Sequence, residues 1–140
     1  MTVFLRLALA LACGCALPAH ACWETAAQRY GIDPRLLYAI AKTESSINPR
    51  AINRNKNGSY DVGLMQINSS WFPLLRRHGI EEKHLYDPCV SLQVASWILA
   101  QNLRRLRDPW LAVGAYNSPT PARAQAYALK VYRNMPPAPR

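Results

Sequence analysis

Two carboxylates, Glu44 and Asp61, are the only acidic residues between Thr43 and Ser70. Glu44 follows the apolar positions Leu37 and Ile40 with helical spacing, which places a carboxyl group at the end of an apolar helix face. Burial there disfavours the charged form and raises the pKa, as a general acid working near neutral pH requires. Position alone, however, favours the plainer interpretation, because most glutamates at helix ends are solvated.

Asp61 follows the Asn57-Gly58 turn signal and precedes Val62-Gly63. It is therefore expected at the end of a strand, facing whatever the turn packs against. The plainer interpretation is a turn residue that hydrogen-bonds nearby backbone, and for Asp61 taken alone this is the favoured one.

Two polar motifs change this balance: GLMQINSSW at 63–71 and AVGAYNSP at 112–119. Gly63 permits a close approach of the backbone, whereas Leu64, Met65 and Ile67 are typical core residues. The remaining amide and hydroxyl side chains suit sugar hydroxyls and N-acetyl groups, and they belong to Gln66, Asn68, Tyr116 and Asn117. Together they indicate a sugar-binding cleft, although Tyr116 equally fits a core aromatic.

Helix starts are marked by an N-cap residue followed by proline at 33–34, 87–88, 108–109 and 120–121. Further helices are expected at 22–30 and 70–78, each followed by glycine, and the longest at about 88–106. The helical period is lost around Asn57-Gly58, where a short hairpin is predicted with arms at 52–55 and 60–62. The expected fold is mainly α, with a small β-turn or hairpin region beside a cleft.

The first 21 residues are expected to form a signal peptide, because Arg6 precedes an apolar run and Ala19-His20-Ala21 has the small-x-small form that signal peptidase cleaves. A lipoprotein cut before Cys13 or Cys15 is a minor alternative. The exported chain would comprise one domain at 22–134 and a flexible tail at 135–140, with no later segment approaching the ~20 apolar residues of a membrane span.

Export leaves Cys22 and Cys89 as the remaining thiols in an oxidising compartment, so we expect them to form a disulfide rather than two buried free thiols. The net charge of +9 points either to an anionic partner surface or simply to a solvated basic face, and export argues against nucleic acid. His78 and His84 lack further ligands nearby, so neither a metal nor another cofactor is expected.

Glu44-Ser45, then GLMQIN, then AYN, in this order, resemble the catalytic domain of the soluble lytic transglycosylases. The resemblance is to the small exported members that accompany secretion systems, conjugation machines and pili, and it covers about 23–132. It implies a lysozyme-like α+β fold, a periplasmic location and peptidoglycan as substrate. It also implies partners in such a machine and action as a monomer.

The same resemblance assigns roles. Glu44 would protonate the glycosidic oxygen between N-acetylmuramic acid and N-acetylglucosamine, then accept the proton of the muramic 6-hydroxyl as a 1,6-anhydro ring closes. Ser45 would hold the helix end and Tyr116 would hydrogen-bond Glu44. The sugar cleft would be lined by Gly63, Met65, Gln66, Asn68 and Asn117.

A second resemblance leaves an alternative open. NRNKNGSYDVGLMQINSSW is similar to a stretch of animal-type lysozymes, where Asp61 would stand at the second catalytic carboxylate and make the enzyme a hydrolase. A wall-binding assembly module that does not cleave is a third hypothesis, against which the intact Glu44 argues.

Overall fold

The structure is a computed structural model that describes residues 19–139. Most of the expected signal peptide, residues 1–18, lies outside the described residues. In chain order the elements are α1 (Ala19–Tyr30), α2 (Pro34–Ser45), β1 (Ile52–Arg54), β2 (Tyr60–Val62), β3 (Ile67–Asn68), η1 (Ser69–Trp71), α3 (Phe72–Arg77), η2 (Glu82–Tyr86), α4 (Pro88–Leu106), α5 (Pro109–Asn117) and α6 (Pro121–Asn134).

The N-cap and proline pairs begin α2, α4, α5 and α6, as the sequence predicts. The carboxylates of Asp33, Asp87 and Asp108 accept hydrogen bonds from backbone N–H groups in the first turn of their helices. Thr120 differs, because its side chain makes no such bond. The start of α6 is therefore marked by Pro121 without a capping side chain.

The hairpin pairs β1 with β2 and continues into a third strand, β3, in the antiparallel order β1-β2-β3. Asp61 lies opposite Asn53 on one side and opposite Asn68 on the other. The helix expected at 70–78 is divided into the 3-10 turn η1 and the short α3.

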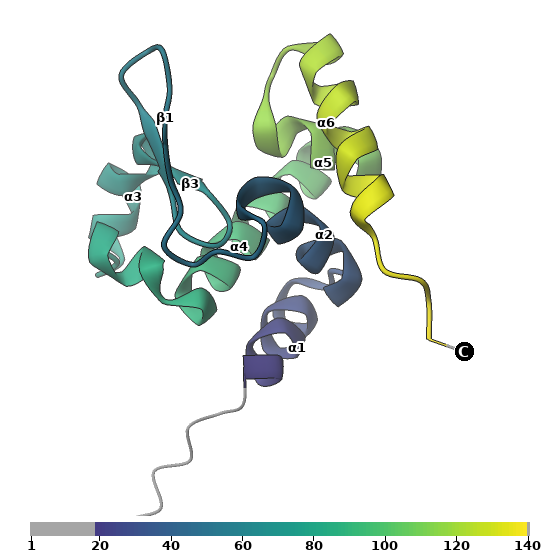
Figure 1. Ribbon diagram of the computed structural model, residues 1–140, viewed down its shortest axis with the longest axis horizontal. Helices are drawn as coiled ribbons and strands as arrows, with labels where there is room; N and C mark the ends of the chain where they lie inside the picture. Colours follow the sequence, from purple (N-terminus) through teal and green to yellow (C-terminus); the bar gives the residue numbers. More distant parts are fainter. Residues whose placement is uncertain (1–18, 140) are drawn as a thin grey trace, which may run out of the picture.

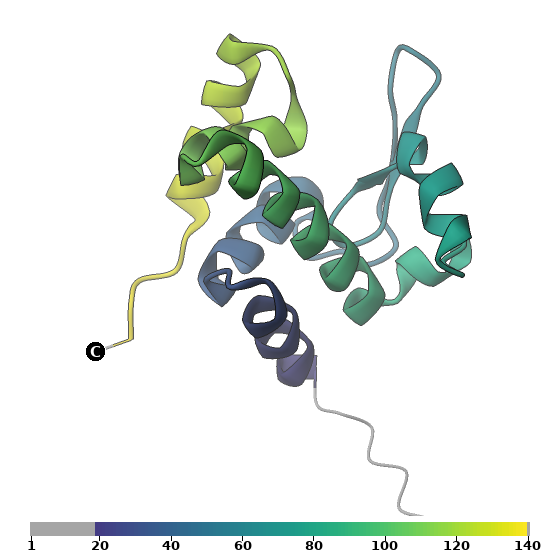
Figure 2. The ribbon, with the colours of Figure 1, turned by 180° about the vertical axis from the view of Figure 1, so that it is seen from behind.

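Helix α4 crosses the middle of the molecule, with the sheet and α3 on one side and α5 and α6 on the other (Figures 1 and 2). Its apolar face is buried at Leu92, Ile98 and Leu99. These side chains join Leu37 and Ile40 of α2 in one core cluster. The fold is therefore mainly helical with a small antiparallel sheet, as expected.

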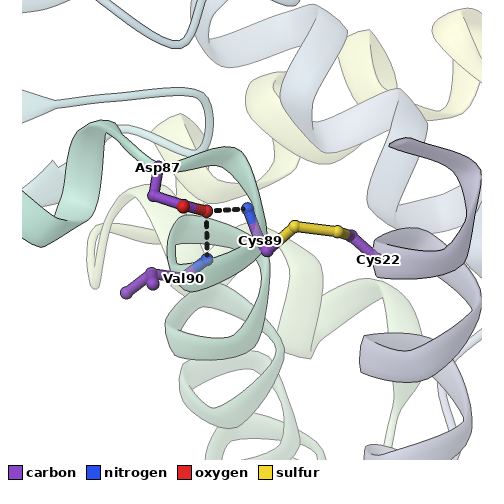
Figure 3. The surroundings of a disulfide bond; sticks show 4 residues. All are labelled: Cys22, Asp87, Cys89 and Val90. Atoms are coloured by element: carbon purple, nitrogen blue, oxygen red, sulfur yellow. Dashed lines mark hydrogen bonds between the residues drawn. A yellow bond between two sulfur atoms is a disulfide. The ribbon is translucent and has the colours of Figure 1, made fainter. Parts of the chain in front are cut away.

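The expected disulfide joins Cys22 in α1 to Cys89 in the first turn of α4, with a Cα–Cα distance of 5.2 Å (Figure 3). The N-cap carboxylate of Asp87 accepts from the backbone N–H groups of Cys89 and Val90, so the bridge meets α4 at a well-capped end. Across residues 19–139, no helix is both long and apolar enough to cross a membrane.

Candidate active site

A cleft of about 830 Å³ separates the sheet from α5 and α6. Both candidate acids line it, Glu44 from the end of α2 and Asp61 from β2. Its other lining residues are Asn55, Lys56, Asn57, Ser59, Gln66, Ile67, Asn68, Ser70, Trp71, Ile98, Asn102, Ala115, Tyr116, Asn117, Ser118, Pro119 and Arg123.

Glu44 is a largely desolvated carboxyl group at the floor of this polar cleft. Its Oε1 accepts a hydrogen bond of 2.5 Å from the hydroxyl of Tyr127. Burial raises the pKa of Glu44 to about 7; the Tyr127 hydrogen bond opposes this shift, and the negative charge of Asp61 adds to it. Near neutral pH the group therefore populates both the acid and the base form, as proton transfer in both directions requires.

The structure corrects the prediction that Tyr116 hydrogen-bonds Glu44. Tyr116 lines the cleft, but its hydroxyl donates to the carbonyl oxygen of Met65 at 2.7 Å. Tyr127 of α6 orients Glu44 instead. The sequence did not reveal this role of Tyr127. Tyr127 shares the buried face of α6 with Ala128 and Val131, so its position in the sequence is that of an ordinary core aromatic.

Asp61 is held by side-chain amides rather than by turn backbone. Asn55 donates to its Oδ2 at 2.9 Å, and Asn68 donates to its Oδ1 at 2.8 Å. Both oxygens thus accept a hydrogen bond from a neutral amide. The arrangement fixes the Asp61 carboxyl group at the cleft wall formed by β2.

Ser45 anchors the end of α2. Its hydroxyl donates to the carbonyl oxygen of Leu64 at 2.7 Å and accepts from the backbone N–H of Asn48 at 3.1 Å. The next residue, Ser46, ends the helix in the left-handed conformation with φ 54. Glu44 is therefore attached to backbone that is tied to the segment leading into β3.

Two residues expected to line the cleft do not do so. Met65 is fully buried in the core, and its backbone N–H donates to the hydroxyl of Ser91. Gly63 has φ +80, and a Cβ there would lie 2.3 Å from the carbonyl oxygen of Leu85. Glycine is required at this position for packing against Leu85 rather than for contact with a sugar.

Gln66 and Asn68 do line the cleft, but their amides are occupied by the protein. Gln66 donates to the carbonyl oxygens of Ala51 and Gly63 and accepts from Asn53. Asn68 donates to Asp61 and accepts from the backbone N–H of Ser70. These two side chains build the cleft wall, which leaves less of their hydrogen-bonding capacity for a ligand than the sequence suggested.

Four further cleft residues differ in how exposed they are and in whether the sequence marked them as candidates. Asn117 is exposed at the end of α5, and its side chain makes no hydrogen bond to the described part of the chain. Trp71 is half-buried, packs edge-on against Trp97 with ring centroids 5.6 Å apart, and offers a face for a sugar ring. Its only sequence signal was its place at the end of GLMQINSSW. Lys56 and Arg123 carried no signal beyond their charge.

Residues 19–139 contain no group of three or more His, Cys, Asp or Glu side chains arranged to hold a metal ion. The cleft holds two carboxyl groups in unlike surroundings, Glu44 largely buried with a pKa raised to about 7 and Asp61 hydrogen-bonded by two amides.

Comparison with known protein families matches residues 21–131 to the Transglycosylase SLT domain family. The chain belongs to this family. As a member of it, the chain is a peptidoglycan lytic transglycosylase with a lysozyme-like fold.

Similar curated proteins include invasion protein IagB of Salmonella typhimurium, 45% identical over 118 residues that make up 81% of this chain and 74% of IagB. Protein IpgF of Shigella flexneri is 41% identical over 80% of this chain and 77% of its own length. The X polypeptide of Escherichia coli is 40% identical over 80% of this chain and 70% of its own length.

Among solved structures, an inactive variant of the lytic transglycosylase Slt from Pseudomonas aeruginosa superposes with a TM-score of 0.67 at 20% identity. The match covers 85% of this chain and 23% of the Slt chain, so this SLT domain corresponds to about a quarter of that protein. The likeness establishes the shared fold.

Proposed function

We propose that this SLT domain cleaves the β-1,4 bond between N-acetylmuramic acid and N-acetylglucosamine with Glu44 as both acid and base. The observation that carries the proposal is the position of Glu44 in the cleft, largely desolvated, bonded to Tyr127 and with a pKa of about 7. A single carboxyl group with that pKa can give up and regain one proton in each turnover.

In the first step, protonated Glu44 donates to the glycosidic oxygen while the bond from that oxygen to C1 of the muramic residue breaks. The N-acetylglucosamine leaves with a free 4-hydroxyl, and positive charge develops at C1 and the ring oxygen. The anionic Asp61, fixed by Asn55 and Asn68, stabilises that charge across the cleft.

In the second step, the 6-hydroxyl of the same muramic residue attacks C1 and loses its proton to the Glu44 carboxylate. A 1,6-anhydro ring forms and Glu44 is protonated again. No water is consumed, because the substrate supplies its own nucleophile and the acid is regenerated by the proton of that nucleophile.

A lysozyme-type muramidase is the second candidate, and the presence of Asp61 in the same cleft as Glu44 favours it. In that reaction Asp61 would stabilise or attack C1, and water would end as a new reducing hydroxyl. The two candidates share Glu44 as the acid and differ in the chemical form of the product.

We further propose that the chain is exported to the periplasm by cleavage after Ala21 and acts there as a monomer. Its disulfide and its basic charge fit that compartment and an anionic wall. The IagB relative is named an invasion protein. We infer a local opening of the wall for a secretion, conjugation or pilus machine, with components of that machine as partners.

The test compares the exported protein with its Glu44→Gln variant on purified peptidoglycan. We expect the wild type to release soluble fragments and the variant to release at least a thousandfold less, while both sediment with the insoluble wall. Equal release by the variant would refute Glu44 as the acid. Binding without release by the wild type would support the assembly-module hypothesis.

A further inference from the structure

The cleft contains two cations that the proposed chemistry does not use. Lys56 lies in the turn between β1 and β2, and Arg123 lies in the first turn of α6, so they enter the cleft from its two opposite walls. Both side chains are exposed. Within residues 19–139 neither makes a hydrogen bond or an ion pair with the protein, since the ion pairs there join Arg35 to Asp33 and Lys83 to Glu81.

These cations are also separate from the acid and base machinery. The charge that shifts the pKa of Glu44 is that of Asp61, and neither cation contributes. Within residues 19–139 Asp61 forms no ion pair, and its hydrogen-bond partners are the amides of Asn55 and Asn68. The positive charges of Lys56 and Arg123 are therefore available to bind a ligand in the cleft.

Their backbone positions are fixed even though their side chains are free. Asn57, next to Lys56, accepts hydrogen bonds from the backbone N–H and the hydroxyl of Ser59 and so closes the hairpin turn. Beside Arg123, α6 approaches α5 so closely that a Cβ on Gly114 would lie 2.8 Å from the carbonyl oxygen of Ala124. Both walls thus present a long cationic side chain from a rigid base.

The chemistry of the substrate supplies a matching anion. Its sugar hydroxyls and N-acetyl groups are neutral, and in strands that carry stem peptides the lactyl carboxyl is bound as an uncharged amide, so the glycan part of such a strand offers a cation little. Carboxylates enter the polymer through the stem peptides, which are attached to the lactyl group of each muramic residue. Arginine and lysine bind such groups by charge-assisted hydrogen bonds, which are stronger than neutral ones.

We propose that Lys56 and Arg123 bind stem-peptide carboxylates from opposite sides of the cleft, so that this chain selects strands that carry these carboxylates over strands that lack them. This inference rests on the proposed function, because it assumes that peptidoglycan occupies the cleft. It assigns substrate selection to two residues that leave the bond-breaking step unchanged.

Binding is measured on the Glu44→Gln background, so that cleavage cannot alter the substrate. The two probes are glycan strands fixed to beads. One carries its stem peptides, and in the other amidase has removed them and the lactyl carboxylates thereby freed have been blocked as neutral amides. The test variant is Lys56→Gln with Arg123→Gln. The control is Lys130→Gln with Arg133→Gln, which makes the same change in net charge at exposed α6 positions outside the cleft lining.

For peptide-bearing strands we expect each cleft substitution to weaken binding about fivefold and the pair about twentyfold, with the control within twofold of the parent. On stripped strands all forms should bind alike. Equal weakening on both probes, or equal weakening by the control pair, would overturn the proposal. Because the readout is binding and not the release of fragments, this outcome is separable from any failure of Glu44 as the acid.

Kinetics with Glu44 intact give a second readout. On peptide-bearing strands the cleft pair should raise KM and leave kcat within about twofold, because the lost interaction is made equally in the ground state and the transition state. A fall in kcat with unchanged KM would contradict a binding role for the two cations.

Discussion

At the scale of single residues, burial and two neighbouring side chains set the protonation of the acid. Burial raises the pKa of Glu44, the charge of Asp61 raises it further, and the hydrogen bond from Tyr127 lowers it, with a net value of about 7. Since the first step needs protonated Glu44, the rate should fall as pH rises through this value. Substitutions of Tyr127 and Asp61 should shift the pH at which the rate falls in opposite directions.

Tyr127→Phe removes the hydrogen bond that stabilises charged Glu44, so the pKa of Glu44 should rise above 7. We expect the alkaline limb of the kcat/KM profile to shift to higher pH. The maximal rate should fall about tenfold, because the carboxyl group loses the bond that orients it. An unshifted limb would show that Tyr127 acts through packing alone.

Asp61→Asn removes a negative charge that disfavours ionised Glu44, so the pKa of Glu44 should fall and the alkaline limb should shift to lower pH. Ser70→Ala, at an exposed residue elsewhere in the cleft lining, is the control and should leave the profile in place. A shift of the Asp61→Asn profile to higher pH would contradict the electrostatic role assigned here to Asp61.

The sequence pointed to Glu44 and Asp61 because each stands in a motif of distinctive residues. It did not point to Tyr127, which lies 83 positions after Glu44 and looks like any buried aromatic on an amphipathic helix. Residue type favoured the core for Met65, whereas the family resemblance placed it in the cleft lining; the structure buries it in the turn between β2 and β3.

At the scale of elements, α6 must pack closely on α5 for Tyr127 to reach Glu44. Gly114 makes this contact possible, because any Cβ there would lie 2.8 Å from the carbonyl oxygen and 2.9 Å from the Cβ of Ala124. The helices on either side of this contact were predictable from their caps. Their separation was not, because it depends on the absence of a side chain at a single buried position.

Gly114→Ala should force α5 and α6 apart and weaken the contact between Tyr127 and Glu44. We expect a loss of about 1–3 kcal/mol in the free energy of unfolding, measured by urea denaturation, and a shift of the alkaline limb toward that of Tyr127→Phe.

Gly31→Ala serves as the control for this prediction. Gly31 has φ +64 with nothing within 4 Å of an added Cβ, so alanine there should cost stability through backbone strain alone. Its pH profile should match that of the wild type. If both glycine variants share one profile, the close packing of α5 and α6 does not position Tyr127.

The sheet shows a further limit of sequence interpretation. Turn chemistry at Asn57-Gly58 predicted β1 and β2, but β3 comprises only Ile67 and Asn68, too short for an alternating pattern to mark it. Its formation depends on pairing with β2, which is a tertiary contact. The same pairing brings Asn68 to Asp61.

At the scale of the whole molecule, the disulfide joins the first described helix to the central α4, with a sequence separation of 67. In the chain-entropy account, closing a loop of this length stabilises the folded state by about 4 kcal/mol.

Reduction of the Cys22–Cys89 bridge should lower the Tm by on the order of 10 °C. The double variant Cys22→Ser with Cys89→Ser should melt at the same lowered temperature and should not respond to reductant. An unchanged Tm on reduction of the wild type, with free thiols shown by alkylation, would mean that the bridge adds nothing to stability.

The most direct test of the account is the chemical form of the product ends. Peptidoglycan digested by the wild-type protein is analysed by mass with and without borohydride, which reduces hemiacetal ends but not 1,6-anhydro ends. We predict muramic ends one water lighter than hydrolysed ones and unchanged by borohydride, in both wild type and Asp61→Asn. Reducible ends carrying the added water would contradict a transglycosylase mechanism and would make Asp61 the second catalytic carboxylate of a hydrolase.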